Sequence, residues 1–198
     1  METEEILSVL AGVGLSAACG FRVFLPLLVL SIASLTGHAH LSHGFEWIGT
    51  WPALLAFLTA TAVEIGAYYI PWLDHALDMI ATPAAVVAGT IVMASLVVDM
   101  PPLMKWSLAI IAGGGSAGVI QSGTVLLRSL STTTTGRFGN FIFSTLELAA
   151  SVITAVLAII VPAICAALVA IILIFSIRAL MKRPRVANLQ TSNDRSTS

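Results

Sequence analysis

The chain has 198 residues, of which 58% are hydrophobic and only 10% are charged, and its formal net charge is −1. An average soluble domain carries about 25% charged residues, so this composition excludes an ordinary soluble domain, and the small net charge gives no reason to expect a nucleic-acid partner. Several apolar runs approach or exceed the roughly 20 residues that cross a bilayer as a helix. We therefore expect an all-α fold, a polytopic membrane bundle of about six transmembrane helices.

The first apolar run covers residues 5 to 36 and contains a single charge, Arg22. A continuous helix of that length would measure about 48 Å, which exceeds a bilayer core of about 30 Å. The run is interrupted at Gly12, Gly14, Gly20 and Pro26. The sequence thus predicts a long kinked helix or a broken one. Its small residues form either a face for close helix packing or a stretch of backbone exposed to a permeating ligand. The acidic start is unlike a cleavable signal peptide, so we expect this run to be retained.

Neither the histidines nor the cysteines predict a metal centre or a disulfide. The polar connection at residues 37–50 contains His38, His40 and His43, a spacing that invites a metal interpretation. Little acid and no cysteine accompany them, so we expect an exposed loop. Cys19 and Cys165 lie in apolar runs and are interpreted as core residues. We expect no cofactor and no metal.

The second apolar run, residues 51–70, contains an acid, Glu64, well inside it. An acid within a membrane segment is costly unless it faces protein or water, and such residues often mark an ion or substrate pathway. Arg22 is the candidate partner of Glu64, because either charge alone in hydrocarbon would be strongly unfavourable. The pair is either a structural ion pair that fixes helix register or a proton or cation site that Arg22 tunes.

Three polar residues, Asp74, His75 and Asp78, follow Pro71 within about one helical turn. Asp74 and Asp78 are four positions apart and share one face of a short helix. They either bind a divalent ion near the cytoplasmic mouth of a pore or form a solvated helix face. A third apolar run follows at residues 82–98, with a proline, Pro83, expected in its first helical turn.

The second half contains further apolar runs at residues 103–130, from residue 141 onward, and at residues 162–178. The first of these is rich in glycine, including Gly114 and Gly118, and ends near Arg128; the next carries Glu147. Ser144-x-x-Glu147 fits a capping box, so Glu147 is either a helix cap or a second pathway acid. The polar segment at residues 182–198 is predicted to be a disordered cytoplasmic tail.

The two halves share an order of features, namely a glycine-rich run, then an acid, then a proline. We therefore expect two membrane repeats, residues 1–100 and 101–181, of three helices each and in opposite orientations. The distribution of basic residues favours six crossings with both termini in the cytoplasm. In this arrangement the cytoplasmic side carries Arg128, Arg137, Arg178, Lys182, Arg183 and Arg185, whereas Lys105 lies on the opposite side.

Specific segments of the sequence resemble a known family. The segment Gly14 to Leu28, with Gly-Phe-Arg and Leu-Pro, and the segment Glu64 to Asp78, with Pro-Trp-Leu-Asp-His, are similar to an uncharacterised family of bacterial integral membrane proteins, domain of unknown function 4126. The stretch Arg128 to Glu147 is similar too, and the resemblance extends over about residues 5–180. It implies a location in a membrane and no assigned activity.

We find no metalloprotease motif, no P-loop and no Cys-x-x-Cys, so no enzyme activity is expected. Scarce charge within a membrane architecture favours a small inner-membrane transporter or channel that is proton- or cation-coupled. Its partners would be the lipid bilayer and a small ion or molecule. The alternative is a membrane scaffold or assembly partner without transport, and a homo-oligomer is compatible with both. The candidate pathway residues are Arg22, Glu64, Asp74, His75, Asp78, Arg128 and Glu147.

Overall fold

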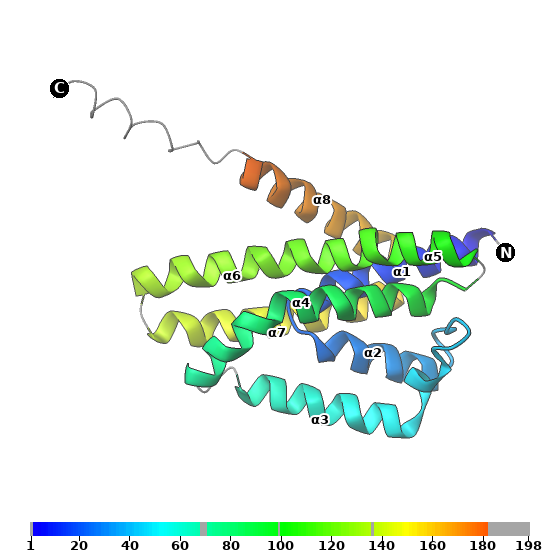
Figure 1. Cartoon of the computed structure of the whole chain (residues 1–198), viewed down its shortest axis with the longest axis horizontal. Helices are drawn as coiled ribbons and strands as arrows, with labels where there is room; N and C mark the ends of the chain where they lie inside the picture. The colour runs from blue at the N-terminus through cyan, green and yellow to red at the C-terminus, as the bar shows by residue number, and fades with distance from the viewer. Residues whose placement is uncertain (1, 68–70, 99, 136, 182–198) are drawn as a thin grey trace, which may run out of the picture.

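The computed structural model shows a bundle of helices (Figure 1). The backbone is described for residues 2–67, 71–98, 100–135 and 137–181, and side chains for residues 3–67, 80–98, 100–128 and 142–178; these ranges contain no strand. The α-helices are α1 Glu2–Cys19, α2 Phe24–Leu35, α3 Trp51–Ala67, α4 Pro71–Leu96, α5 Pro102–Leu108, α6 Gly115–Thr135, α7 Arg137–Ile160 and α8 Pro162–Met181. A 3₁₀ turn, η1 Glu46–Gly49, precedes α3, and a π-helical segment, η2 Ala109–Gly114, joins α5 to α6.

The lengths and surfaces of the helices support association with a membrane. The segments Pro102–Arg128 and Ile142–Ile160 are long and apolar enough to cross a membrane, by length and composition. Shorter apolar helices are Phe24–Leu35, Trp51–Ala67, Ile80–Leu96 and Pro162–Arg178. Large apolar side chains such as Leu103, Ile111 and Phe175 are exposed. Exposed apolar patches of this kind mark membrane or protein contacts.

The first apolar run is broken and folds back on itself. Helices α1 and α2 run in opposite directions (Figure 1). Glu4, His40 and Val97 line one cavity, which places the start of α1, the connection after α2 and the end of α4 at the same end of the bundle. Of the two predicted forms of this run, a long kinked helix or a broken one, the structure shows the broken one, and the connection after α2 lies near the start of α1. We call α1, α2 and their connection the hairpin, and residues 20–23 its tip.

Local chemistry explains why the run breaks where it does. The backbone N–H groups of Gly20, Phe21 and Arg22 donate to the carbonyls of Ala17 and Ala18, which closes the last turn of α1. A side chain could not replace the hydrogen of Gly20, because a Cβ there would lie 2.6 Å from the carbonyl oxygen of Ala117 on α6. The tip therefore lies directly against α6.

Pro26, which we expected to disturb a helix, instead lies in the first turn of α2. A proline is tolerated there, because the N–H that it lacks would have no partner within the helix. The proline thus favours a helix start next to the tip.

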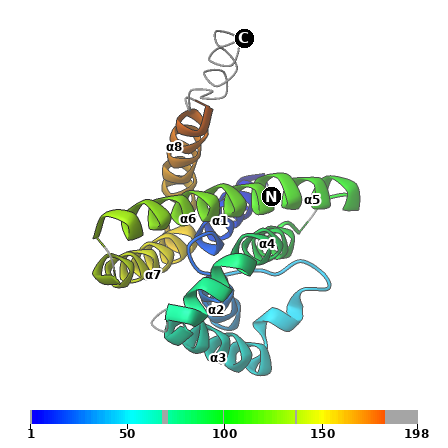
Figure 2. The ribbon, with the colours of Figure 1, turned by 60° about the vertical axis from the view of Figure 1, so that its left-hand side comes forward.

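Helix α1 lies at the centre of the bundle and contacts α2, α4, α6, α7 and α8 (Figure 2). Its glycines provide the room for this packing. A Cβ on Gly12 would lie 2.5 Å from the sulfur of Met93, and a Cβ on Gly14 would lie 2.7 Å from the Cβ of Ala158. On α6, a Cβ on Gly118 would lie 3.0 Å from a methyl group of Val86. At these positions the small residues serve close helix packing.

The third apolar run is part of a longer helix than the sequence suggested. Helix α4 starts at Pro71 and contains Pro83 in its interior, whereas we expected Pro83 in a first turn. Pro83 removes one helix hydrogen bond, and α4 changes direction along its length in Figure 1, as a proline in a helix interior predicts.

The glycine-rich helices of the two halves run parallel. Gly12 on α1 packs on Met93, which also contacts Gly113. Gly20, just past the end of α1, contacts Ala117, which follows Gly113 in the chain. Both helices therefore advance in the same direction, as Figure 1 also shows. The two helices therefore do not have the inverted relation that the sequence predicted. Stripes of small residues permit close packing of parallel and of antiparallel helices, so they could not specify the direction. The expected boundary at residue 100 falls in the connection between α4 and α5.

Candidate polar site in the bundle interior

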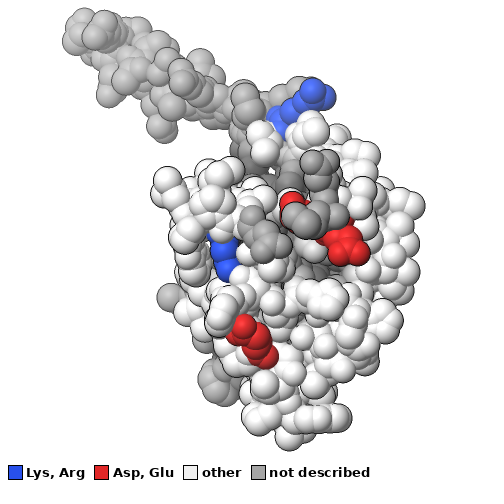
Figure 3. Space-filling view, turned by 90° about the vertical axis from the view of Figure 1, so that its right-hand side faces the viewer, with Lys and Arg blue, Asp and Glu red and all other residues white. Residues whose placement is uncertain are grey.

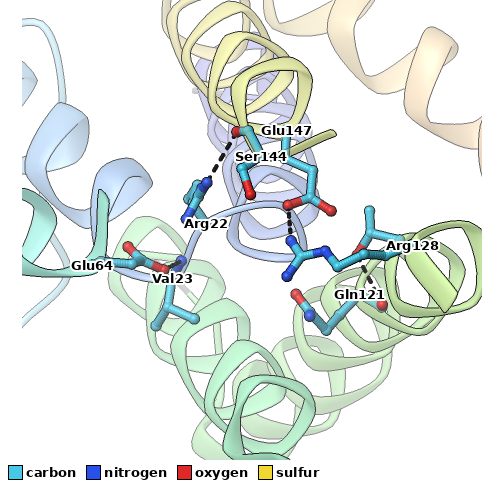
Figure 4. Close-up of polar contacts among 8 residues, drawn as sticks. Arg22, Val23, Glu64, Gln121, Arg128, Ser144 and Glu147 are labelled. Carbon is cyan, nitrogen blue, oxygen red and sulfur yellow. Dashed lines mark hydrogen bonds and ion pairs between the residues drawn. The ribbon is translucent and has the colours of Figure 1, made fainter. Parts of the chain in front are cut away.

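Four charged side chains are buried around the tip and the neighbouring helices (Figure 4). Their exposed fractions are 1% for Arg22, 7% for Glu64, 6% for Arg128 and 6% for Glu147. They come from the tip, α3, α6 and α7 in turn. All four were candidate pathway residues, and a buried charge requires partners that replace its hydration.

Glu64 caps the N-terminus of α2. The backbone N–H of Val23 donates to Oε1 of Glu64 at 2.8 Å, and the backbone N–H of Phe24 donates to Oε2 at 3.1 Å. The N-cap residue, Val23, forms no cap of its own with its side chain. A carboxylate from α3 thus satisfies N–H groups that the helix itself leaves without acceptors, where the helix dipole also favours negative charge.

The pattern of α3 explains how this carboxylate reaches the interior. Its buried residues recur every three or four positions and form one stripe: Ala53, Phe57, Thr61, Glu64 and Ala67. This stripe faces the hairpin, since α3 packs on α2. Hydrogen bonds to a charged group contribute about 1.5–3 kcal/mol each, so the cap offsets much of the cost of burying Glu64.

Arg22 extends from the same tip toward α7. Its Nη2 donates to the backbone carbonyl of Ser144 at 3.0 Å. Figure 4 shows the guanidinium directed toward Ser144, whereas Glu64 approaches the tip from α3. The sequence predicted that Arg22 and Glu64 are partners, and in the structure both lie at the tip. The structure also assigns Glu64 two backbone donors next to Arg22, which composition and spacing could not indicate.

Arg128 and Glu147 form a buried ion pair between α6 and α7. We considered Glu147 as a helix cap, because Ser144-x-x-Glu147 matches the capping-box pattern. That interpretation is wrong, since both residues lie inside α7, which begins at Arg137. The pairing of Glu147 with Arg128 was not predicted. The residues are 19 positions apart and meet only because α6 and α7 fold against each other.

A large apolar groove lies beside Glu64. It has a volume of about 710 Å³ and is formed by the start of α2, by α3 and by α4. Glu64 is the only charged residue among the described lining residues. These residues are Val23, Phe24, Leu55, Ala56, Thr59, Ala60, Val63, Glu64, Ala67, Ile80, Ala81 and Ala84. Arg22, Arg128 and Glu147 do not line it. Glu64 therefore connects the tip to a groove that the other buried charges do not reach.

The remaining candidates are three residues at the start of α4 and the histidines of the connection after α2. Asp74, His75 and Asp78 fall in the first turns of α4, and their side chains lie outside the described residues. His43 is exposed and contacts the carboxylate of Glu46 at 3.2 Å. Within the residues that the structure describes, no cluster of three potential metal ligands occurs. Both cysteines are free and buried.

The end of the bundle that carries the start of α1 is mostly uncharged, and separate acidic and basic side chains are scattered over the face seen in Figure 3. Lys105 donates to the hydroxyl of Ser42 and lies 5.1 Å from the ring centre of Phe45, which fastens the connection after α2 to α5. Glu46 accepts a hydrogen bond from the backbone N–H of Gly44 at 2.7 Å. Hydrogen bonds from its own backbone N–H and from that of Gly44 hold the pKa of Glu46 below its usual value.

Residues 114–118 match Gly-x-Ser-x-Gly, a pattern that surrounds some nucleophilic serines. The structure places this pattern within continuous helix, at the end of η2 and the start of α6. Ser116 is buried in a helix and its hydroxyl donates to the carbonyl of Gly113 at 2.9 Å. A nucleophile would need an exposed turn and a neighbouring base.

Comparison with protein families gives one finding. The model of a protein family described as "Domain of unknown function (DUF4126)" matches residues 9–182 of the chain. No curated protein and no solved structure matches the chain. The match includes the tip, Glu64, Arg128 and Glu147, and it confirms the resemblance inferred from the sequence.

Proposed function

We propose a function from the premise that the chain belongs to the family described as a domain of unknown function (DUF4126), a description that assigns no activity. The protein is a small transporter or channel of the bacterial inner membrane, and Glu64 carries the proton or cation that moves. One observation supports this assignment above others: Glu64 is both the cap of α2 and a wall of the groove. A change in its charge therefore acts on the hairpin and on the groove together.

The cap gives Glu64 a physical means to couple charge to structure. An ionised carboxylate accepts strong hydrogen bonds from Val23 and Phe24, whereas a protonated one is a weaker acceptor and gains an O–H donor. Loss of the cap would release α3 from the tip. A broken membrane helix whose half-helix end meets a charged group is also the arrangement found at the binding sites of many transporters.

The other buried charges connect neighbouring elements of the bundle to each other. Arg22 fixes the tip to α7 through Ser144, and Arg128 with Glu147 joins α6 to α7. Neither interaction involves the wall of the groove. In this proposal they keep the tip in place while the protonation of Glu64 changes.

The proposed membrane arrangement has five crossings, by α3, α4, α5–α6, α7 and α8, and a hairpin that enters and leaves on one side. Arg137 begins α7 and Arg178 lies in the last turn of α8, and in Figure 1 both helix ends are on the side away from the N-terminus. The positive-inside rule assigns that side to the cytoplasm. The N-terminus is then outside, in contrast to our expectation from sequence that both termini are cytoplasmic.

Labelling of introduced cysteines tests this arrangement. We expect Thr3→Cys and His40→Cys to react with a membrane-impermeant maleimide from the same side of the membrane, and Arg137→Cys from the other. The native Cys19 and Cys165 are buried and should stay unlabelled in the folded protein. Labelling of Thr3→Cys and His40→Cys from opposite sides would restore the single crossing by the first apolar run.

Flux through reconstituted protein tests the role of Glu64. We expect Glu64→Gln to lower proton or cation flux into liposomes by about tenfold or more, because the amide keeps the size of the side chain but cannot ionise. The matched control is Glu46→Gln, which removes an exposed carboxylate in the connection after α2. Unchanged flux in Glu64→Gln would remove Glu64 from the pathway.

A scaffold without transport is the second candidate, and the packing of glycines favours it. A Cβ on Gly89 would lie 2.8 Å from the carbonyl oxygen of Gly113, so α4 and η2 touch through their backbones. Such contacts build a rigid, filled interior. Absence of flux through correctly folded wild-type protein would favour the scaffold.

A further inference from the structure

From the shape and charge of the groove we infer that it binds a lipophilic organic cation, an apolar body that carries one positive charge, with the Glu64 carboxylate as the counter-ion. This inference rests on the proposed function, because it names the class of substrate that Glu64 would exchange for a proton. The groove lies between α2, α3 and α4, as described above.

The groove has the size and lining of a site for a small apolar molecule. Small-molecule sites commonly have volumes of about 300–1,000 Å³, and this groove has about 710 Å³. Its described walls are aliphatic apart from Phe24, Thr59 and Glu64. The hydroxyl of Thr59 donates to the carbonyl of Leu55 in its own helix, so it offers a ligand little. The lining thus favours an apolar ligand with a single polar group.

The groove opens on the outer surface of the bundle. Leu55, Val63 and Ile80 line it, and their side chains are 58%, 65% and 58% exposed. These residues belong to apolar helices that we place in the membrane. A ligand would therefore enter sideways from the lipid, where an apolar molecule concentrates.

The charge at the inner wall selects the sign of the ligand. Each oxygen of Glu64 accepts one backbone N–H, which leaves further lone pairs for a positively charged group. The guanidinium of Arg22 is directed toward Ser144 on α7 and does not line the groove (Figure 4). A cation that enters meets the carboxylate, whereas an anion would meet a like charge in an apolar environment.

The site implies competition between two positive charges. In the described part of the lining, the Glu64 carboxylate balances either one bound proton or one bound organic cation. Binding of the cation to protonated Glu64 would therefore release one proton, and the reverse exchange would return it. Such mutual exclusion is the basis of proton-coupled exchange of a cation.

Equilibrium binding of tetraphenylphosphonium to the purified full-length protein in lipid nanodiscs tests the inference. We expect saturable binding, and at least tenfold weaker binding to Glu64→Gln. Tetraphenylborate, which has four phenyl groups but the opposite charge, is the ligand control and should not bind at this site. Ala56→Phe, which fills the groove from an exposed position, should also weaken binding. Its matched control, Ala167→Phe on the exposed side of α8, should not.

Three outcomes would overturn the inference. Equal binding of tetraphenylborate would show that the groove takes any apolar molecule, such as a lipid acyl chain. Binding unchanged in Glu64→Gln, with the variant folded by its thermal unfolding curve, would remove the carboxylate from the site. Absence of tetraphenylphosphonium binding, together with proton flux that depends on Glu64, would leave the proposed function intact and exclude this substrate class. Glu64-dependent binding without any flux would support the site and count against transport.

Discussion

Replacement of Glu147 by alanine is expected to destabilise the folded protein by about 3–5 kcal/mol, because it leaves the Arg128 guanidinium buried without its carboxylate. Both side chains are almost fully buried, at 6% exposure each. The effect should appear as a lower midpoint of chemical unfolding in mixed micelles. Arg128→Ala should be destabilising for the same reason, since it leaves a buried carboxylate.

The double variant Arg128→Met with Glu147→Leu provides the control. Replacing a buried ion pair by apolar side chains of similar volume is often nearly neutral, so we expect a smaller loss than for either single truncation. The double-mutant cycle then isolates the coupling between the two side chains. Equal losses in the single and double variants would mean that packing, and not the ion pair, joins α6 to α7.

Gly113→Leu is expected to prevent α4 and η2 from packing and to cost more than the roughly 1–3 kcal/mol of an ordinary overpacked core position. A Cβ on Gly113 would lie 2.5 Å from the backbone carbonyl oxygen of Gly89 and 2.6 Å from the Cβ of Met93. Backbone cannot move aside as a flexible side chain can. The measurement is the yield of monodisperse protein and its thermal unfolding midpoint.

Gly123→Ala is the matched control in α6. A Cβ there meets nothing within 4 Å. Because alanine favours a helix by about 0.8–1.0 kcal/mol over glycine, the variant should be as stable as the wild type or more so. A Gly113→Leu protein that unfolds at the wild-type midpoint would contradict the close crossing of α4 and η2.

The sequence located the buried charges better than it located their partners. Arg22 and Glu64 stand out because they are isolated charges in apolar runs, and the structure buries both. The partners of Glu64 are backbone N–H groups of Val23 and Phe24, which every residue except proline carries. Backbone donors leave no trace in composition or spacing, so only the folded chain could identify this cap.

The sequence also could not predict that the first apolar run folds back on itself. Its glycines and Pro26 predicted a kink or a break, and the break lies between them. A long kinked helix and a folded-back pair of helices have the same composition and length. What separates them is tertiary contact at the tip, where Glu64 and Ser144 supply partners from α3 and α7.

The apparent repeat failed because its signals are short and common. Small residues four positions apart occur on α1 and near Gly114, and they fit parallel and antiparallel packing equally well. Ser144-x-x-Glu147 resembled a helix start but lies within α7. Each pattern was real in the sequence, and none of them specified the direction of a helix.

The contacts of the tip can form only after later parts of the chain have been synthesised. The carboxylate that caps α2 lies 40 and 41 residues beyond its donors, and the carbonyl that Arg22 contacts lies 122 residues further along the chain. At roughly 5–20 residues per second, a ribosome reaches Ser144 about 6–24 s after Arg22. During that interval the guanidinium of Arg22 lacks its contact with the Ser144 carbonyl. The N-terminal hairpin is therefore among the last parts of the protein to be completed.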